Sequence, residues 1–217
     1  MMTPRPPSPL PEELLAGYRR FQHGLSAPEH ELYARLAADG QQPHAMVIAC
    51  SDSRSAPEAV FDAGPGELFV VRNVAALVPV YAPDAGRHAA SAALEFAVLA
   101  LGVESIVVMG HGGCGGVKAA FDDAAPLTST DFIGAWVDGL RDLEPLLDPA
   151  DAADEAARPR ALEHLVVEQS LANLRTFPWI RRPEATGALT IHGLWFDVGL
   201  RELHIYTPAG WAVQPHD

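Results

Sequence analysis

The stretch Ala45-Met46-Val47-Ile48-Ala49 decides how this sequence is interpreted, because it is a short, uninterrupted apolar run that ends directly at Cys50. A run of this length that is rich in aliphatic residues is typical of a strand buried on both faces. Similar runs along the chain predict further strands at 67–71, 105–109, 189–196 and 203–206.

Helical patterns separate several of these strands. An alanine- and leucine-rich stretch, 88–101, predicts a buried helix that ends at Gly102, and further helices are expected from 116 onwards and over 129–147. Residues 148–157 are expected to form an acidic surface loop. Alternating strands and helices indicate an α/β fold. We expect a mostly parallel central sheet of four strands with one antiparallel edge strand, and helices on both faces.

The first part of the chain differs in composition and in the spacing of its apolar residues. Residues 1–11 are rich in proline, and 12–38 follow helical spacing with a break near Pro28. We therefore predict an N-terminal helical arm over 1–40 and a single α/β catalytic domain over 41–217.

Composition excludes some classes of function. The chain has 217 residues and a net charge of −13, which disfavours binding to nucleic acid. No apolar run is long enough to span a bilayer, and the start of the chain lacks an apolar signal core. With only two cysteines, the protein is expected to be cytoplasmic, without a membrane or nucleic-acid partner.

Three side chains that zinc favours follow two of the predicted strands. Cys50 ends the first strand, whereas His111 and Cys114 follow the strand at 105–109. The carboxyl ends of parallel strands meet at one edge of a sheet, so these side chains can converge. Two thiolates and one imidazole leave a fourth zinc position open, which is the arrangement of catalytic rather than structural sites.

The residues around these ligands suggest further roles. Gly112 and Gly113 allow the backbone to approach a ligand closely, and N–H groups at the start of a helix favour an anion. Asp52 can accept a hydrogen bond from a zinc-bound water, and Arg54 can hold that carboxylate ionised through a bidentate pair.

Together these motifs carry a resemblance. Cys50-Ser51-Asp52-Ser53-Arg54, followed by His111-Gly112-Gly113-Cys114-Gly115-Gly116, resembles the signature of the β-class carbonic anhydrases, and the similarity covers roughly 46–206. The resemblance implies one zinc ion per chain, held by Cys50, His111 and Cys114. It also implies reversible hydration of carbon dioxide to bicarbonate and a proton by zinc-bound hydroxide, with Asp52 and Arg54 as the catalytic dyad. Finally, it implies a homodimer or tetramer in which the arm embraces a neighbouring copy.

One position departs from part of that family. Some bacterial members carry a tryptophan three residues before the first zinc cysteine, as part of a regulatory bicarbonate site, and here that position is Val47. The departure argues against this type of regulation.

Other functions fit the same residues. A zinc hydrolase of carbonyl sulfide or carbon disulfide would have the same metal ligands, and so would a non-catalytic module stabilised by zinc. A redox protein is disfavoured because the two cysteines lack Cys-x-x-Cys spacing.

Three more residues carry expectations about their surroundings. Arg72 is expected either to line the cleft or an interface or to pair with an acidic residue such as Glu95. His192 is expected to be a hydrogen-bonded core residue and His204 a surface residue.

Overall fold

The computed structural model of the chain describes residues 9–84, 86–122, 128 and 132–215. The chain divides into two units, Met1–Gly40 and Gln41–Asp217.

The first unit contains two helices, α1 (Glu12–Gly24) and α2 (Ala27–Asp39). Ser26 and Glu29 form a capping box that starts α2. The break predicted near Pro28 therefore lies two residues earlier, and Pro28 belongs to the first turn of α2. Proline is tolerated there because its missing N–H would have no partner within the helix.

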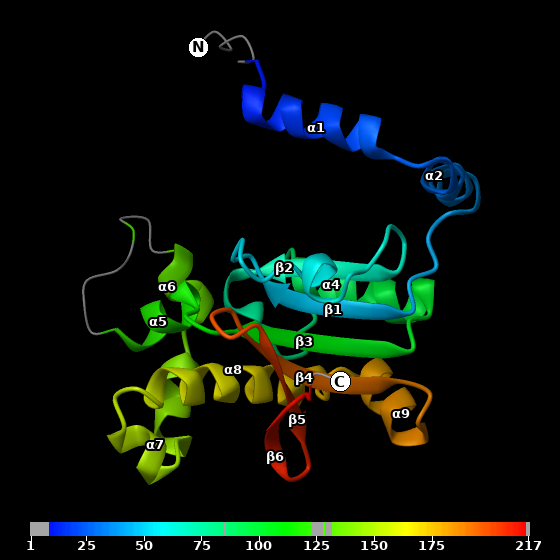
Figure 1. Cartoon of the computed structure of the whole chain (residues 1–217). Coiled ribbons are helices and arrows are strands. Elements are labelled where there is room, and N and C mark those ends of the chain that lie inside the picture. Colours follow the sequence, from blue (N-terminus) through cyan, green and yellow to red (C-terminus); the bar gives the residue numbers. More distant parts are fainter. Residues whose placement is uncertain (1–8, 85, 123–127, 129–131, 216–217) are drawn as a thin grey trace, which may run out of the picture. The chain divides into compact units, whose positions relative to one another are not determined.

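The second unit is built on a six-stranded sheet with the strand order β2-β1-β3-β4-β5-β6 (Figure 1). Its strands are β1 (Ala45–Cys50), β2 (Leu68–Asn73), β3 (Ser105–His111), β4 (Thr190–Asp197), β5 (Glu202–Thr207) and β6 (Gly210–Val213). The first four are parallel and β5 is antiparallel, as predicted. The strand β6 was not predicted, and it pairs antiparallel with β5 at the edge of the sheet.

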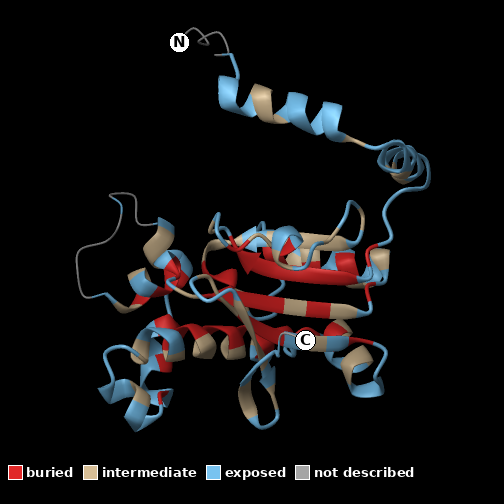
Figure 2. Ribbon diagram, viewed as in Figure 1, coloured by how far each residue is buried: buried red, intermediate tan, exposed pale blue. Residues whose placement is uncertain are grey.

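Helices bury one face of the sheet. Apolar side chains of β1 and β3 on this face pack with α4 (Ala89–Glu95), α8 (Arg158–Leu174) and α9 (Pro178–Thr186). Buried residues follow β1, β3 and α8 in Figure 2. On the other face, Val47, Ala49 and Met109 form a smaller cluster, to which the one-turn helix α3 (Pro57–Val60) contributes.

Several predicted helices differ in detail. The helix expected over 88–101 is α4 followed by a π-helical segment, η2 (Phe96–Leu101), and Gly102 ends it in the left-handed conformation. The helix expected over 129–147 is wrong as a single element, although 129–131 lie outside the described residues. Its described part consists of α6 (Phe132–Val137) and a 3-10 helix, η3 (Leu140–Leu146), separated by Gly139 at φ 84°.

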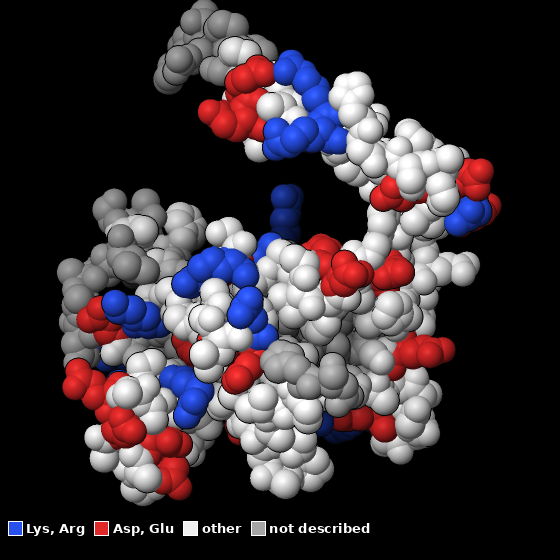
Figure 3. Space-filling view, in the orientation of Figure 1, with Lys and Arg blue, Asp and Glu red and all other residues white. Residues whose placement is uncertain are grey.

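The acidic stretch 148–157 is only partly a loop. It contains a short helix, α7 (Pro149–Ala153), which begins at Asp148 because that side chain accepts a hydrogen bond from the Ala150 amide at 2.8 Å. Acidic side chains gather over α7 at the lower left of Figure 3. The expected acidic surface is therefore present, carried by a capped helical turn.

An aromatic cluster joins α8 to the antiparallel edge of the sheet. The His164 ring stacks on Trp211 of β6 at 4.1 Å between ring centroids and lies edge-on to Trp195 of β4 at 5.1 Å. His204 of β5 packs 4.8 Å from Trp195, and its side chain is only 12% exposed. The expectation that His204 is a surface residue is therefore wrong. His192 was predicted to lie in the core, and this prediction is wrong because the residue is exposed. Its Nε2 does form a hydrogen-bond contact, with Thr190 Oγ1 at 2.9 Å.

This cluster predicts an acid-sensitive contribution to stability. Burial, with His204 and Arg160 nearby, lowers the pKa of His164 from 6.5 to about 3. Above pH 6.5 His164 is neutral in both states and contributes no pH dependence. Below pH 6.5 the unfolded chain binds a proton that the folded chain excludes, so stability falls by up to about 1.4 kcal/mol per pH unit until about pH 3.

Replacing His164 with Phe keeps an aromatic ring in the cluster and removes this titration. Urea unfolding at pH 7.5 and pH 5.5 is expected to show a smaller loss of stability in His164→Phe than in the wild type. His23→Gln, on the exposed last turn of α1, serves as the control and should retain the wild-type loss. Equal losses in wild type and His164→Phe would contradict the assignment.

Candidate metal centre

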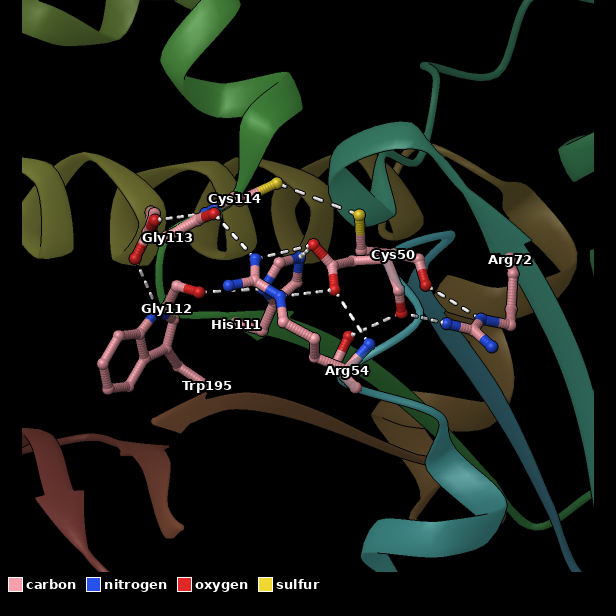
Figure 4. Close-up of polar contacts among 11 residues, drawn as sticks. Cys50, Arg54, Arg72, His111, Gly112, Gly113, Cys114 and Trp195 are labelled. Carbon is pink, nitrogen blue, oxygen red and sulfur yellow. Dashed lines mark hydrogen bonds and ion pairs between the residues drawn. The ribbon is translucent and has the colours of Figure 1, made fainter. Parts of the chain in front are cut away.

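The structure brings Cys50, His111 and Cys114 together (Figure 4). Cys50 ends β1 and His111 ends β3, and these strands are parallel neighbours in the sheet. Cys114 immediately precedes helix α5 (Gly115–Phe121). The three ligand atoms lie within 4.8 Å of one another, and all three residues are buried.

The donor atoms of this cluster fit a zinc ion. The Sγ atoms of Cys50 and Cys114 are 3.9 Å apart, close to the separation of about 3.8 Å that two thiolates have on a tetrahedral zinc. His111 Nδ1 lies 3.0 Å from the Gly112 carbonyl oxygen, to which it can donate, so Nε2 carries a free lone pair. His111 Nε2 is buried and has no hydrogen-bond partner, which is costly unless a metal binds there.

The two thiols titrate as a pair. The hydrogen bond between them lowers the pKa of Cys50 to about 4 and raises the pKa of Cys114 above its usual range. One thiolate is therefore favoured at neutral pH even before a cation binds, which suits a site for a soft metal ion.

Asp52 and Arg54 form the bidentate pair that the sequence predicts. Arg54 Nε donates to Asp52 Oδ1 at 2.9 Å, and Nη2 donates to Oδ2 at 2.7 Å. The Arg54 amide also donates to Oδ1 at 2.9 Å. These hydrogen bonds lower the pKa of Asp52 well below its usual range. Asp52 Oδ2 lies 3.9 Å from His111 Nε2, so the ionised carboxylate borders the metal cluster.

The glycines shape the loop that carries Cys114. Gly113 has φ +66°, a conformation that side chains disfavour, and its carbonyl oxygen accepts a hydrogen bond from Arg54 at 3.1 Å. The Gly112 amide donates to the Phe196 carbonyl oxygen at 2.9 Å, so it is not available for an anion. Gly112 therefore has no free backbone donor for an anion, and the anion-binding role of Gly113 stays a prediction.

Sequence reasoning missed two residues beside the cluster, Glu163 of α8 and Trp195 of β4. Glu163 Oε1 accepts a hydrogen bond from the Cys114 amide at 2.9 Å, and Oε2 accepts one from Trp195 Nε1 at 3.0 Å. Burial raises the pKa of Glu163. The sequence contains one signal for Glu163, which lies beside the apolar Leu162 and Val166 of the same helix. A carboxylate on the apolar side of a helix requires a hydrogen-bond partner.

Among the described residues, no acidic side chain pairs with Arg72, and the alternative that it lines the cleft or an interface stays a prediction. It donates from Nε to the Cys50 carbonyl oxygen at 2.9 Å and from Nη2 to the Asp52 carbonyl oxygen. Its role in the structure is to hold the backbone that follows β1, as Figure 4 shows.

Two clefts open beside the metal cluster, and Gly113 and Glu163 line both. The first has a volume of about 760 Å³ and an apolar wall that includes Val117 and Leu162. The second has a volume of about 650 Å³ and a polar wall with charges of both signs, from Arg54, Arg160, Asp154, Glu163 and Asp197. A small molecule can therefore approach this edge of the sheet along an apolar or a polar wall.

No helix in the described part of the chain is both long enough and apolar enough to cross a membrane.

Comparisons with known proteins converge on one family. The family model described as carbonic anhydrase matches residues 45–202, which include every residue of the site. A carbonic anhydrase of Pseudomonas aeruginosa is 40% identical over 187 residues, which cover 86% of this chain and 83% of that protein. The solved structure of the β-carbonic anhydrase CcaA has a TM-score of 0.84 and 26% identity, covering 94% of this chain and 92% of that one. Another match is a structure from a study of two tetrameric β-carbonic anhydrases of Sordaria macrospora, with a TM-score of 0.71 and 29% identity over 93% and 94% of the two chains.

Proposed function

Because this chain is an enzyme of the β-class carbonic anhydrase family, we propose that it catalyses the reversible hydration of carbon dioxide to bicarbonate and a proton at the Cys50–His111–Cys114 cluster. One zinc ion per chain would be held by the two Sγ atoms and by His111 Nε2. When bound, zinc supplies a Lewis acid that lowers the pKa of a water molecule, so that a nucleophile is available near neutral pH.

The observation that carries this proposal is the Asp52–Arg54 pair at the edge of the cluster. Arg54 engages both oxygens of Asp52, which keeps the carboxylate ionised and fixes its direction. Asp52 is then an acceptor only, so it can hold the proton of the reacting water and leave the lone pair of that water directed at carbon dioxide. A module stabilised by zinc has no need for such an acceptor.

The clefts suit the substrate and the product. Carbon dioxide is uncharged and weakly hydrated, so the apolar wall formed by Val117 and Leu162 favours its approach. Bicarbonate is an anion, and the second cleft, whose wall is polar and carries charges of both signs, gives it a hydrated route to solvent. Both walls lie next to Gly113, beside the metal cluster.

Stopped-flow measurement of carbon dioxide hydration by the zinc-loaded full chain tests this proposal. We expect hydration in proportion to the bound zinc, and loss of hydration after treatment with a chelator. Release of sulfide from carbonyl sulfide, measured on the same samples, distinguishes the related hydrolase. A protein that holds zinc and does not hydrate carbon dioxide would contradict the proposed reaction.

We extend the proposal to assembly and location. A homodimer or tetramer is supported by the tetrameric relatives from Sordaria macrospora and by the arm over 1–40, whose large apolar side chains Leu14, Tyr18 and Phe21 are exposed. Sedimentation of the full chain measures this assembly. A cytoplasmic location is supported by the free thiol state of Cys50 and Cys114.

A further inference from the structure

Glu163 is a charged side chain in an unusual place. It lies on α8 and is 5% exposed, among a small number of buried polar residues in the described part of the chain. It lines both surface clefts and also the small inner cavity formed by Cys50, His111 and Cys114. A carboxylate in such a position is costly unless its oxygens accept strong hydrogen bonds.

Both oxygens of Glu163 are used, and each has a different donor. Oε1 accepts from the backbone amide of Cys114 at 2.9 Å, and Oε2 accepts from Trp195 Nε1 at 3.0 Å. The first contact fixes the backbone of a metal ligand. The second fixes the indole ring, which packs against the loop so closely that a Cβ atom on Gly112 would lie 3.1 Å from it.

The loop over 112–114 is consequently held at three successive residues. The Gly112 amide donates to the Phe196 carbonyl oxygen, the Gly113 carbonyl oxygen accepts from Arg54, and the Cys114 amide donates to Glu163. Of these three anchors, Glu163 is the one that acts directly on a proposed metal ligand.

We propose that Glu163 is a positioning residue for the metal centre: its carboxylate aligns the Cys114 thiol with Cys50 and His111 by accepting hydrogen bonds from the Cys114 amide and the Trp195 indole at once. This inference rests on the proposed zinc site and deepens it. Metal sites commonly lose about 10–100-fold in affinity when such supporting contacts are removed.

The chemistry requires a carboxylate rather than any polar group. A glutamine has one acceptor oxygen and one NH₂ donor, so in Glu163→Gln the NH₂ group would face either the Cys114 amide or the Trp195 indole. Two N–H groups would then point at one another. Replacing Trp195 with Phe removes one donor, and the glutamine oxygen is then free to accept from the Cys114 amide.

The test measures metal affinity in Glu163→Gln, Trp195→Phe and the double variant. Competition for zinc with a chromophoric chelator gives the affinity, and the thiolate charge-transfer absorption of the cobalt-loaded protein reports the ligand geometry. We expect Glu163→Gln to lose about 10–100-fold in zinc affinity and to shift the cobalt spectrum. The double variant should recover the affinity and spectrum of Trp195→Phe.

The same helix offers a matched control. Glu168 of α8 accepts a hydrogen bond from the indole Nε1 of Trp211 at 2.8 Å, which reproduces the glutamate–tryptophan contact without touching the metal loop. Glu168→Gln is expected to retain wild-type zinc affinity and spectrum. A Glu163→Gln variant that loses thermal stability but keeps both readouts would overturn the proposal.

If Glu163→Gln alone does not fold, the same comparison is made in the Trp195→Phe background. There, Glu163→Gln should keep the zinc affinity of Trp195→Phe, whereas Glu163→Leu, which provides no acceptor, should lose it. Equal affinities would overturn the proposal. Because these readouts are affinities and spectra, they are separate from the proposed reaction, which fails if zinc-loaded wild type does not hydrate carbon dioxide.

Discussion

Asp52→Asn is expected to slow carbon dioxide hydration by about 10²–10⁴-fold, the usual effect of losing a proton acceptor in the transition state, while zinc content stays unchanged. Asparagine places an NH₂ group against the guanidinium of Arg54. Because both groups are then hydrogen-bond donors, the bidentate pair cannot form. The charge that accepts the proton of the reacting water is lost as well. Stopped-flow hydration and zinc analysis on the same preparation measure the two effects separately.

A second bidentate pair supplies the control. Arg175 donates to both oxygens of Glu184, with Nη2 to Oε1 at 2.8 Å and Nε to Oε2 at 3.2 Å. Glu184→Gln breaks a pair of the same kind outside the metal centre and should leave hydration at the wild-type rate. Arg54→Lys keeps the positive charge but loses the fork geometry, so an intermediate rate is expected. A fully active Asp52→Asn would contradict the role of this dyad and favour a non-catalytic zinc module.

The predictable part of the site was the part encoded locally. Cys50, Asp52 and Arg54 lie within five residues, and His111 and Cys114 lie within four. A strand before each motif was enough to bring both motifs to one edge of a parallel sheet, and the structure has them there. The bidentate geometry of Asp52 and Arg54 was also predictable, because a two-residue separation leaves little freedom in a turn.

The missed part depends on contacts across long sequence separations. Glu163 contacts Cys114 and Trp195, which are 49 and 32 residues away, and no local pattern encodes these pairs. The strand β6 was missed for a related reason, since its four residues become a strand by pairing with β5 and packing Trp211 on His164. In α8, apolar residues at 162, 166, 167, 171 and 174 do have helical spacing, so that helix could have been predicted.

Replacing Cys114 with Ser is expected to remove zinc and activity together. Serine fills nearly the same volume, but its hydroxyl does not ionise near neutral pH and is a poor zinc ligand. In structural sites with four protein ligands, zinc binding of about 12 kcal/mol corresponds to about 3 kcal/mol per ligand, so losing one thiolate here should cost more than about 100-fold in affinity. Competition with a chelator measures the affinity. The same change should also abolish the rise in melting temperature that zinc produces in the wild type.

The two thiols provide an independent readout, because the chain contains only Cys50 and Cys114. In the wild type, added zinc should protect both thiols from alkylation, since a thiolate that binds metal is a poor nucleophile. In Cys114→Ser, zinc should no longer protect Cys50. His23→Asn, which changes an exposed histidine of α1, is expected to keep both the affinity and the protection. If Cys114→Ser bound zinc as tightly as wild type, Cys114 would not be a zinc ligand, and the proposed set of three ligands would be wrong.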